Sequence, residues 1–185
     1  MRDVEYTIKY SDKNTPNDII YDIMNIEKDV YKENERGHFD CIEKRFDKNK
    51  EMFVLLYDSN KIIGYLCFFP ITKSLHDRIL HNDNFYDDNI EAEDVVPYET
   101  KNYIYFISIA LYKKYHGLGL GTKMMDAFMK KLREKDQSGY KIKDILASAV
   151  SEQGEAITKK YGFTLLSDMS EQFGYKLMYL EGDKL

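Results

Sequence analysis

The sequence contains no tryptophan, only two cysteines, four histidines and no long apolar run. Cys41 and Cys67 are too few for a disulfide framework, and no two histidines lie at the close helical spacing of a zinc site. No stretch reaches the roughly 18 apolar residues of a membrane span, and the first residues lack the apolar stretch of a secretory signal. We therefore expect a cytoplasmic protein that binds no metal and does not contact a membrane.

Basic residues are also too few for a nucleic-acid-binding surface, because 27 Lys and Arg stand against 32 Asp and Glu and the net charge is -5. We therefore expect no nucleic-acid partner. The charge is uneven along the chain, however. Residues 79–100 carry seven acidic residues and no Lys or Arg, whereas residues 112–135 carry a local charge of +5. Solvated surfaces would explain both segments; alternatively, a polyanion binds near the second and a cationic substrate near the first.

The length of 185 residues fits one domain over 1–185, since a chain of this size buries roughly 70 % of its unfolded surface. Apolar patterns predict strands at 4–9, 52–57, 62–69, 103–111, 142–150, 163–166 and 175–180. Apolar residues three or four positions apart predict helices at 19–31, 39–46, 120–132 and 152–161. The order is mixed α/β, with an early hairpin and a late βαβ unit, and residues 71–100 show no clean period.

Three glycines, Gly117, Gly119 and Gly121, alternate between an apolar strand and an amphipathic helix. Glycine permits a tight turn and lets a ligand approach the main chain, and the helix that follows begins with free N–H groups and a positive dipole end. The segment therefore predicts a cradle for phosphate or pyrophosphate. A nucleotide P-loop needs Gly-Lys before Ser or Thr, whereas Lys123 follows Thr122 here, and a dinucleotide G-x-G-x-x-G pattern fits neither starting glycine.

The same segment resembles the central motif of the GNAT superfamily of acyl-CoA N-acyltransferases. That motif consists of an apolar strand, then Arg/Gln-x-x-Gly-x-Gly/Ala, then a helix. Here residues 109–111 resemble the end of the strand and residues 116–121 resemble the loop, with His116 in place of Arg or Gln. The segment therefore matches the motif in its residue types and in the strand and helix expected before and after the loop.

A second motif follows downstream, where the family often shows Asn-x-x-Ala-x-x-Leu-Tyr-x-x-x-Gly-Phe. Residues 151–163 keep this spacing, but Ser151, Gly154 and Thr158 stand in place of Asn, Ala and Tyr. Because the two motifs occur in the family's order, the resemblance covers most of the chain, and it is weakest over residues 71–100. It implies a GNAT-like central mixed sheet with splayed central strands, flanked by helices.

The resemblance also implies acetyl-CoA as the co-substrate, a polyanion that suits the basic segment, and no metal. In the family, the pantetheine arm inserts between the splayed strands and the loop amides hold the pyrophosphate. The cofactor-binding residues that this implies are Ile109, Ala110, Leu111, His116, Gly117, Leu118, Gly119, Leu120, Gly121, Thr122 and Ser151. Lys113, Lys114 and Lys123 would add diffuse positive charge, and a strand N–H would stabilise the oxyanion.

Two catalytic positions follow from the resemblance, Tyr105 and Thr158. Some family members carry a glutamate five residues before the Ala110 position; Tyr105 stands there and would orient a water, although core packing also explains it. Thr158 stands where a family tyrosine protonates the departing thiolate. It is a weaker acid, but a thiol with a pKa of about 8.5 leaves without strong acid help. Acidic residues between 83 and 99, Glu99 among them, are alternative bases.

The implied function is an N-acetyltransferase that moves an acetyl group from acetyl-CoA to a primary amine by direct attack. The acceptor would be a cationic amine on a small molecule or peptide, with the acidic segment 79–100 over it as a lid. Because Tyr105 and Thr158 depart from the family pattern, a non-catalytic acyl-CoA-binding or regulatory module is one alternative. An acidic interaction protein that docks a basic partner is another. An exposed terminal strand would allow a homodimer.

Overall fold

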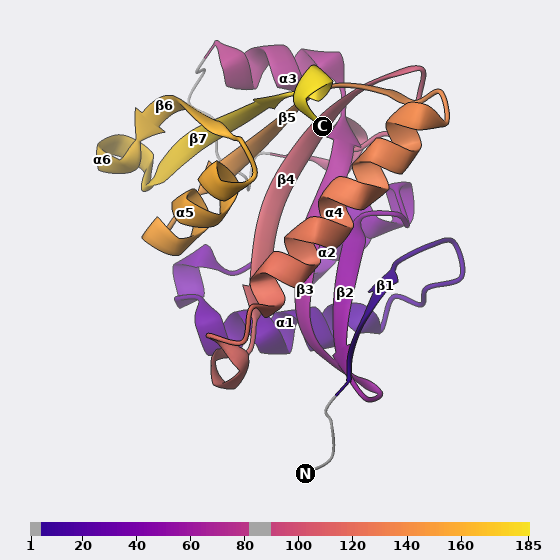
Figure 1. Ribbon diagram of the computed structural model, residues 1–185, viewed down its shortest axis with the longest axis vertical. Coiled ribbons are helices and arrows are strands. Elements are labelled where there is room, and N and C mark those ends of the chain that lie inside the picture. Colours follow the sequence, from indigo (N-terminus) through magenta and orange to yellow (C-terminus); the bar gives the residue numbers. More distant parts are fainter. Residues whose placement is uncertain (1–4, 82–89) are drawn as a thin grey trace.

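The computed structural model describes residues 5–81 and 90–185. Its centre is a seven-stranded sheet in the order β1-β2-β3-β4-β5-β7-β6 (Figure 1). Neighbouring strands are antiparallel except β4 and β5, which are parallel. The strands are β1 (Tyr6–Tyr10), β2 (Phe53–Asp58), β3 (Lys61–Ile71), β4 (Lys101–Leu111), β5 (Lys141–Ala149), β6 (Thr164–Met169) and β7 (Tyr175–Glu181). The mixed sheet expected from the sequence is confirmed.

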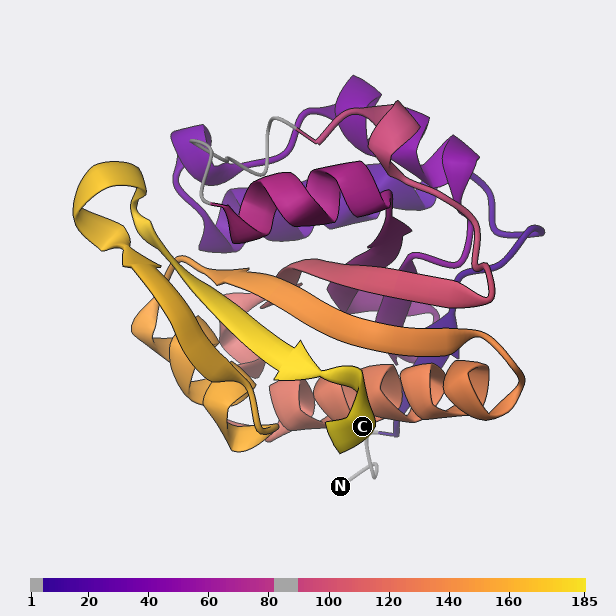
Figure 2. The same ribbon diagram turned by 90° about the horizontal axis from the view of Figure 1, so that it is seen from above.

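Helices cover both faces of the sheet, which makes three layers (Figure 2). One face carries α1 (Ile19–Val30), α2 (Phe39–Lys48) and α3 (Lys73–Leu80). The other face carries α4 (Leu120–Gln137) and α5 (Glu152–Lys160), and the short helix α6 (Ser170–Phe173) joins β6 to β7. Because the sheet is covered on both sides, β3 is buried at every position after Lys61.

Two apolar cores lie on the two faces of the sheet. Successive side chains of a strand point to opposite faces, so Tyr65 and Phe69 join the core under α1, α2 and α3, whereas Phe68 joins the core under α4. On the α4 side, the Phe128 ring lies 4.8 Å from the Phe68 ring and 5.3 Å from the Phe106 ring, measured between centroids. These contacts fix the helix that begins at the glycine segment against the central strands.

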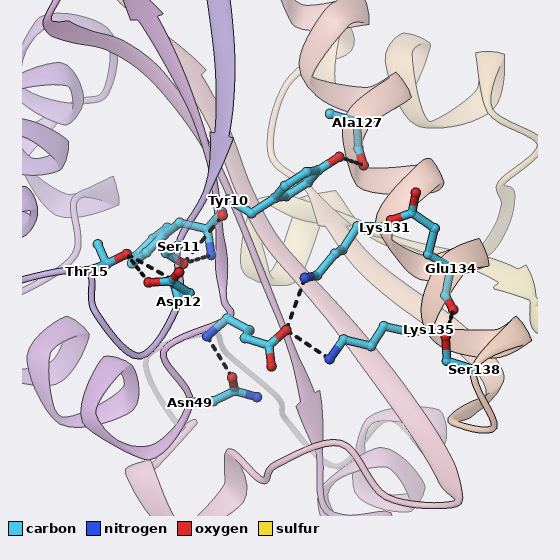
Figure 3. A network of polar contacts seen from close by, with 12 residues as sticks. Tyr10, Ser11, Asp12, Thr15, Asn49, Ala127, Lys131, Glu134, Lys135 and Ser138 are labelled. Atoms are coloured by element: carbon cyan, nitrogen blue, oxygen red, sulfur yellow. Dashed lines mark hydrogen bonds and ion pairs between the residues drawn. The ribbon is translucent and has the colours of Figure 1, made fainter.

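Polar contacts attach the middle of α4 to the first strands (Figure 3). The Tyr10 hydroxyl donates to the carbonyl oxygen of Ala127 at 3.0 Å. Glu51, just before β2, forms ion pairs with Lys131 at 3.1 Å and Lys135 at 2.9 Å. Contacts along the length of α4 thus hold the helix in place in addition to the loop before it.

Helix α3 lies in the segment for which the sequence showed no clean period. The Thr72 hydroxyl caps it by accepting a hydrogen bond from the N–H of Leu75 at 3.2 Å, and Leu75, His76 and Ile79 bury one face. Eight residues with so few apolar positions leave too short a pattern to recognise. The other strands and helices expected from the sequence are present, with ends that differ by a few residues.

None of the helices in the described ranges combines the length and the hydropathy that crossing a membrane requires. Within residues 5–81 and 90–185, no three His, Cys, Asp or Glu side chains are grouped so that they could hold a metal ion. The thiols of Cys41 and Cys67 are both free. At the edge of the sheet, β6 exposes Leu165 and Leu166, and the expected pairing of copies through a terminal strand stays a prediction.

Candidate active site

The parallel strands β4 and β5 separate part-way along their length. Backbone pairing joins residues 101–106 of β4 to residues 141–147 of β5 and ends there. Beyond this point β4 pairs with β3 and runs toward α4, whereas β5 pairs with β7 and runs toward α5 (Figure 1). A bulge marks the separation, because Phe106 pairs with Phe68 and Ser108 pairs with Cys67, which leaves Ile107 unmatched on β3. The expected splayed strands are therefore confirmed.

A cavity of about 690 Å³ opens where the two strands separate. Its walls are residues 106–111 of β4, residues 147–151 at the end of β5 and the first turns of α5. Its volume lies in the range of small-molecule and cofactor sites. Of the cofactor-binding residues expected from the sequence, those that line it are Ile109, Ala110, Leu111, His116, Gly117, Gly119, Leu120, Gly121, Thr122 and Ser151. Leu118 does not line the cavity, and its side chain is 56 % exposed.

The glycine loop, residues 115–122, leads from β4 into α4 at one end of this cavity. Gly117 and Gly119 have φ angles of +80° and +73°, a left-handed conformation that other residues rarely adopt. A Cβ atom at either position would meet nothing within 4 Å. Glycine is therefore favoured by the backbone conformation and not by crowding from neighbouring atoms. The first N–H groups of α4 have no intrahelical acceptor, and they line the cavity together with the loop. The arrangement suits an anion.

One cation beside the glycine loop was missed from the sequence. The Lys160 ammonium, at the end of α5, donates to the Thr122 hydroxyl oxygen at 3.2 Å. Of the three lysines expected to contribute charge, Lys123 instead donates to the backbone carbonyl of Tyr6, on β1. The contact between Lys160 and Thr122 joins residues 38 positions apart, so no local pattern in the sequence could indicate it.

Alternate residues of β4 turn their backbone groups toward the cavity. Tyr112 donates its N–H to β3, and hydrogen-bonded pairs alternate along an antiparallel ladder. Ile109 and Leu111 therefore face the space between β4 and β5. Their carbonyl oxygens accept hydrogen bonds from the Tyr31 hydroxyl and from Nε2 of His116, each at 3.0 Å. Their N–H groups are consequently the backbone groups that they offer to a ligand.

The two residues expected to be catalytic occupy different environments. Thr158 lines the cavity but is only 3 % exposed, and its hydroxyl donates to the carbonyl oxygens of Gly154 and Glu155, each at 2.9 Å. Tyr105 is fully buried and does not line the cavity. Its hydroxyl lies 2.6 Å from the hydroxyl of Ser148, which does line it. Tyr105 is thus one side chain away from the cavity, and both catalytic roles stay predictions.

A second pocket, of about 380 Å³, lies on the α1 side of β4. It is formed by α1 and the loop after it, by β3 and by the connection from α6 into β7. Five residues line both spaces: Tyr31, Glu35, Ile107, Ser108 and Val150. The cavity and the second pocket therefore meet at the bulge of β4.

Glu27 is a buried carboxylate in the second pocket, only 7 % exposed. The Tyr65 hydroxyl donates to its Oε1 at 2.7 Å, and the N–H of Gly37 donates to its Oε2 at 2.8 Å. The Ser108 hydroxyl in turn donates to the Tyr65 oxygen at 3.2 Å. Burial raises the pKa of Tyr65 well above its usual value, so the phenol keeps its proton. Sequence reasoning missed Glu27, although its place four residues after Ile23 puts a carboxylate on the apolar face of α1.

The described part of the acidic segment lies against α2. Residues 92–94 form a 3₁₀ turn beside that helix. The Arg45 side chain, which lines the second pocket, donates to the carbonyl oxygen of Ile90 from Nε at 3.0 Å and from Nη2 at 2.6 Å. Glu99, an alternative base, lines neither space. The acidic residues of this segment that lie outside the described residues are Asp83, Asp87 and Asp88. The proposed lid therefore stays a prediction.

Parted central strands that lead into a glycine loop define an acyltransferase type of fold. The chain belongs to the acetyltransferase (GNAT) family, whose sequence model matches residues 20–156. The resemblance seen in the two sequence motifs is thereby confirmed. Among curated protein sequences, none matches the chain significantly.

Several solved structures are similar to the chain over nearly its whole length. The loading GNATL domain of CurA from Lyngbya majuscula has a TM-score of 0.70 at 14% identity, covering 98% of this chain and 100% of that chain. Ard1 from Thermoplasma volcanium has a TM-score of 0.64 at 16% identity, covering 96% and 98%. Naa50 from Arabidopsis thaliana, in complex with the bisubstrate analogue CoA-Ac-MVNAL, has a TM-score of 0.63 at 10% identity, covering 96% and 99%. At these identities the likeness shows the fold.

Proposed function

We propose that this protein is an N-acetyltransferase that moves an acetyl group from acetyl-CoA to a primary amine. The observation that carries the proposal is the meeting of two spaces at Ile107 and Ser108, one ending at an anion-binding loop and the other at a buried carboxylate. Direct transfer needs the thioester and the amine bound at once and in contact. Two spaces that share one wall supply that arrangement, and the family supplies the acyl-transfer chemistry.

Acetyl-CoA suits the cavity through the chemistry of its walls. The pyrophosphate would bind to the N–H groups of residues 117–122, with Lys160 beside them. The pantetheine amides would pair with the backbone of Ile109 and Leu111 in place of a neighbouring strand. Ser151 caps α5 by accepting a hydrogen bond from the N–H of Gly154 at 3.0 Å, which holds that helix at the cavity wall.

The second pocket favours a cationic amine as the acceptor, on a small molecule or a peptide. Its acidic residues are Glu27 and Glu35, and its aromatic rings attract a cation through their faces. Arg36 and Arg45 also line the pocket, but both guanidinium groups donate to backbone carbonyl oxygens, that of Arg36 to Tyr31 at 3.0 Å. These hydrogen bonds leave both positive charges in place, so the proposed preference for a cation rests on the ring faces and on direct contact of the ammonium with the Glu27 or Glu35 carboxylate.

The proposed reaction is a direct attack without a covalent enzyme intermediate. The neutral amine nitrogen attacks the thioester carbon, and the carbonyl oxygen becomes an oxyanion that an N–H of β4, at Ile109 or Leu111, stabilises. Collapse of the adduct breaks the C–S bond and releases CoA. Because the thiol has a pKa of about 8.5, the thiolate leaves with little acid help, and Thr158 in place of a stronger acid does not prevent turnover.

A non-catalytic acyl-CoA-binding module is the second candidate. One observation favours it: Tyr105 is buried behind Ser148, and the Thr158 hydroxyl donates to helix carbonyl oxygens. Such a module would bind acetyl-CoA and CoA but would release no CoA in the presence of any amine. An acidic interaction protein would bind neither cofactor.

The first test is the melting temperature with acetyl-CoA, with free CoA and with NAD as the control. Ligand at about 100 times its dissociation constant adds roughly 2.7 kcal/mol of stability, which is a rise of about 5 to 10 °C for a domain of this size. A rise with both CoA forms, followed by thiol release with a panel of amines, supports the transferase. A rise without thiol release favours the binding module, and no rise at millimolar ligand rejects both.

A further inference from the structure

We propose that Ser108, Tyr65 and Glu27 form a proton relay that takes a proton from the acceptor ammonium to the Glu27 carboxylate. The relay rests on the proposed transfer to an amine, and it adds the route by which that amine becomes a nucleophile. Ser108 is the catalytic member, because it would touch the amine. Tyr65 and Glu27 act through it, and they are positioning residues.

The three side chains form an unbroken series of hydrogen bonds with one direction. Ser108 donates to Tyr65 at 3.2 Å, and Tyr65 donates to Glu27 at 2.7 Å. Since each hydroxyl hydrogen points toward the carboxylate, the Ser108 oxygen keeps a lone pair for a donor on its other side. Ser108 lines both the cavity and the second pocket, so that donor can be an amine next to the thioester.

A relay is needed because an alkylamine has a pKa near 10.4. At pH 7, on the order of one amine in a few thousand is neutral and able to attack. In the relay, the ammonium gives a proton to the Ser108 oxygen, Ser108 gives its own proton to Tyr65, and Tyr65 gives its own to Glu27. The hydroxyls end unchanged, the amine is neutral and the carboxylate has become a carboxylic acid.

A second proton of the amine passes to the departing sulfur. The neutral amine forms the C–N bond, and the adduct nitrogen then carries one hydrogen too many for an amide. As the C–S bond breaks, that proton passes to the thiolate and gives CoA as a thiol. After the products leave, the relay runs in reverse and Glu27 returns its proton to water. Each turnover thus releases one proton, acetylated amine and CoA.

Glu27 is better placed for this role than the other acidic residue among the described residues that line the two spaces. That residue, Glu35, is exposed, and its Oε2 accepts the N–H of Lys32 at 3.1 Å, which closes its own turn. Glu27 is buried, and its Oε1 is bound to the relay itself. A carboxylate held away from water gains or loses its proton through the relay.

Charged groups face Glu27 from several elements around the pocket. Arg36, after α1, and Arg45, on α2, are positively charged, and Glu35 is negatively charged. Burial raises the pKa of the Cys67 thiol, which therefore adds no charge at neutral pH. The other titratable side chains that line the pocket are Tyr31, Tyr65 and Tyr175. These are the charged and titratable groups that surround the relay in the second pocket.

The decisive experiment is the pH profile of kcat/KM for Glu27→Gln, measured by thiol release from acetyl-CoA with the best amine of the panel. The variant keeps the shape of the side chain and must wait for amine that is already neutral. We expect kcat/KM about a hundredfold below the wild type at pH 7, a typical loss for a proton acceptor. The deficit should shrink about tenfold per pH unit as the amine loses its proton unaided.

Two further variants interrupt the relay at its other members. Tyr65→Phe and Ser108→Ala should show the same deficit at pH 7 and the same recovery at high pH. Ser108→Thr keeps the hydroxyl and should restore the wild-type profile. A residue with only a structural role would lower the rate at every pH by a similar factor.

Two control variants lie outside both spaces and match the changes made. Glu51→Gln removes a partnered carboxylate, the one paired with Lys131 and Lys135, and Tyr98→Phe removes a buried tyrosine hydroxyl. Both should keep the wild-type pH profile. The melting-temperature rise with acetyl-CoA, measured on every variant, shows that each is folded and binds the cofactor.

The outcomes separate the relay from the proposed function. Wild-type turnover with a pH-dependent deficit in the three relay variants supports both. Wild-type turnover with unchanged or uniformly lowered profiles in those variants overturns the relay and leaves the transferase standing. Absence of wild-type thiol release with every amine overturns the transferase and, with it, the relay.

Discussion

At one end of the β4–β5 pair the strands are joined, and at the other they are parted. The joined end is closed by a buried His76, whose Nε2 lies 2.9 Å from Oδ2 of Asp144 and whose Nδ1 lies 3.2 Å from Oδ1 of Asp77. The ring of Tyr103 packs on the imidazole, with 4.2 Å between centroids. Every polar ring atom of His76 is therefore held by another side chain, as is typical of a structural site.

At the parted end, the strand partner is replaced by two side chains. Tyr31 and His116 bind the carbonyl oxygens of Ile109 and Leu111, and the corresponding N–H groups face the cavity. The same two strands thus use their hydrogen bonds for stability at one end and leave donors for a ligand at the other. Changes at the joined end should alter folding, and changes at the parted end should alter binding and turnover.

The largest expected effect is on stability, from Asp144→Ala at the joined end. The change removes the carboxylate partner of the buried His76. Breaking a buried pair in this way lowers the free energy of unfolding by about 3 kcal/mol. Urea unfolding should show that loss, whereas calorimetric titration should give an unchanged dissociation constant for acetyl-CoA. An unaltered midpoint, or a loss of cofactor affinity in folded protein, would break the comparison between the two ends.

The next effect concerns the glycine loop and uses a matched pair of glycines. Gly119 and Gly139 both have positive φ, at +73° and +96°, and a Cβ at either would meet no neighbour within 4 Å. Changing either to Ala should lower the free energy of unfolding by about 1 to 2 kcal/mol. Gly119→Ala should also weaken acetyl-CoA binding by about tenfold, because relief of the strain turns the loop amides. Equal affinities in the two variants would contradict the anion-binding role of the loop.

A smaller effect is expected from a matched pair of tyrosines. The hydroxyls of Tyr31 and Tyr10 each donate to a backbone carbonyl oxygen at 3.0 Å, the first at the parted strands and the second on α4 (Figure 3). Replacing either by Phe should lower stability by about 1 kcal/mol. Only Tyr31→Phe should change kcat/KM, by roughly fivefold, because it frees the Ile109 carbonyl beside the site. Steady-state kinetics on both variants would show whether the effect is confined to one end.

The last prediction is the pH dependence of the joined end. Burial lowers the pKa of His76, but the hydrogen bonds and charges of Asp144 and Asp77 outweigh it and leave the pKa above 6.5. A raised histidine pKa stabilises the folded state fully below pH 6.5, and that stabilisation is lost as pH rises through the folded value. The difference in unfolding free energy between wild type and His76→Gln should therefore shrink from pH 6 to pH 8.5. A constant difference would mean that His76 does not titrate in the folded protein.

Much of this architecture was predictable because its signals are local. The glycine spacing, the strand predicted at residues 103–111 and the helix predicted at residues 152–161 each depend on residues close together in the chain, and the structure has both elements with ends that differ by one or two residues. Helix α3 was not predicted because its eight residues give only about two turns of pattern. The length of α4 was underestimated because its last turn is polar on every side.

The polar network of the second pocket could not be predicted in the same way. Tyr65 meets Glu27 across 38 residues and Ser108 across 43, and no local period records such pairs. The motif position of Tyr105 was found, but its burial depends on how the strand is packed between two layers. A carboxylate on the apolar face of α1 was the one local sign that something polar lay beneath the helix.

The bulge at Ile107 changes which side chains of β4 face which helix layer. Before it, odd-numbered side chains such as Tyr103 and Tyr105 face the α1 layer; after it, the even-numbered Ser108 and Ala110 do. One inserted residue thus switches the side chains that face the α1 layer from odd-numbered to even-numbered positions in the rest of β4. If the same residues continued as a regular strand without the bulge, Ser108 would point toward the opposite layer, away from Tyr65. The cavity and the second pocket therefore meet at Ser108 because the register of β4 shifts by one residue at Ile107.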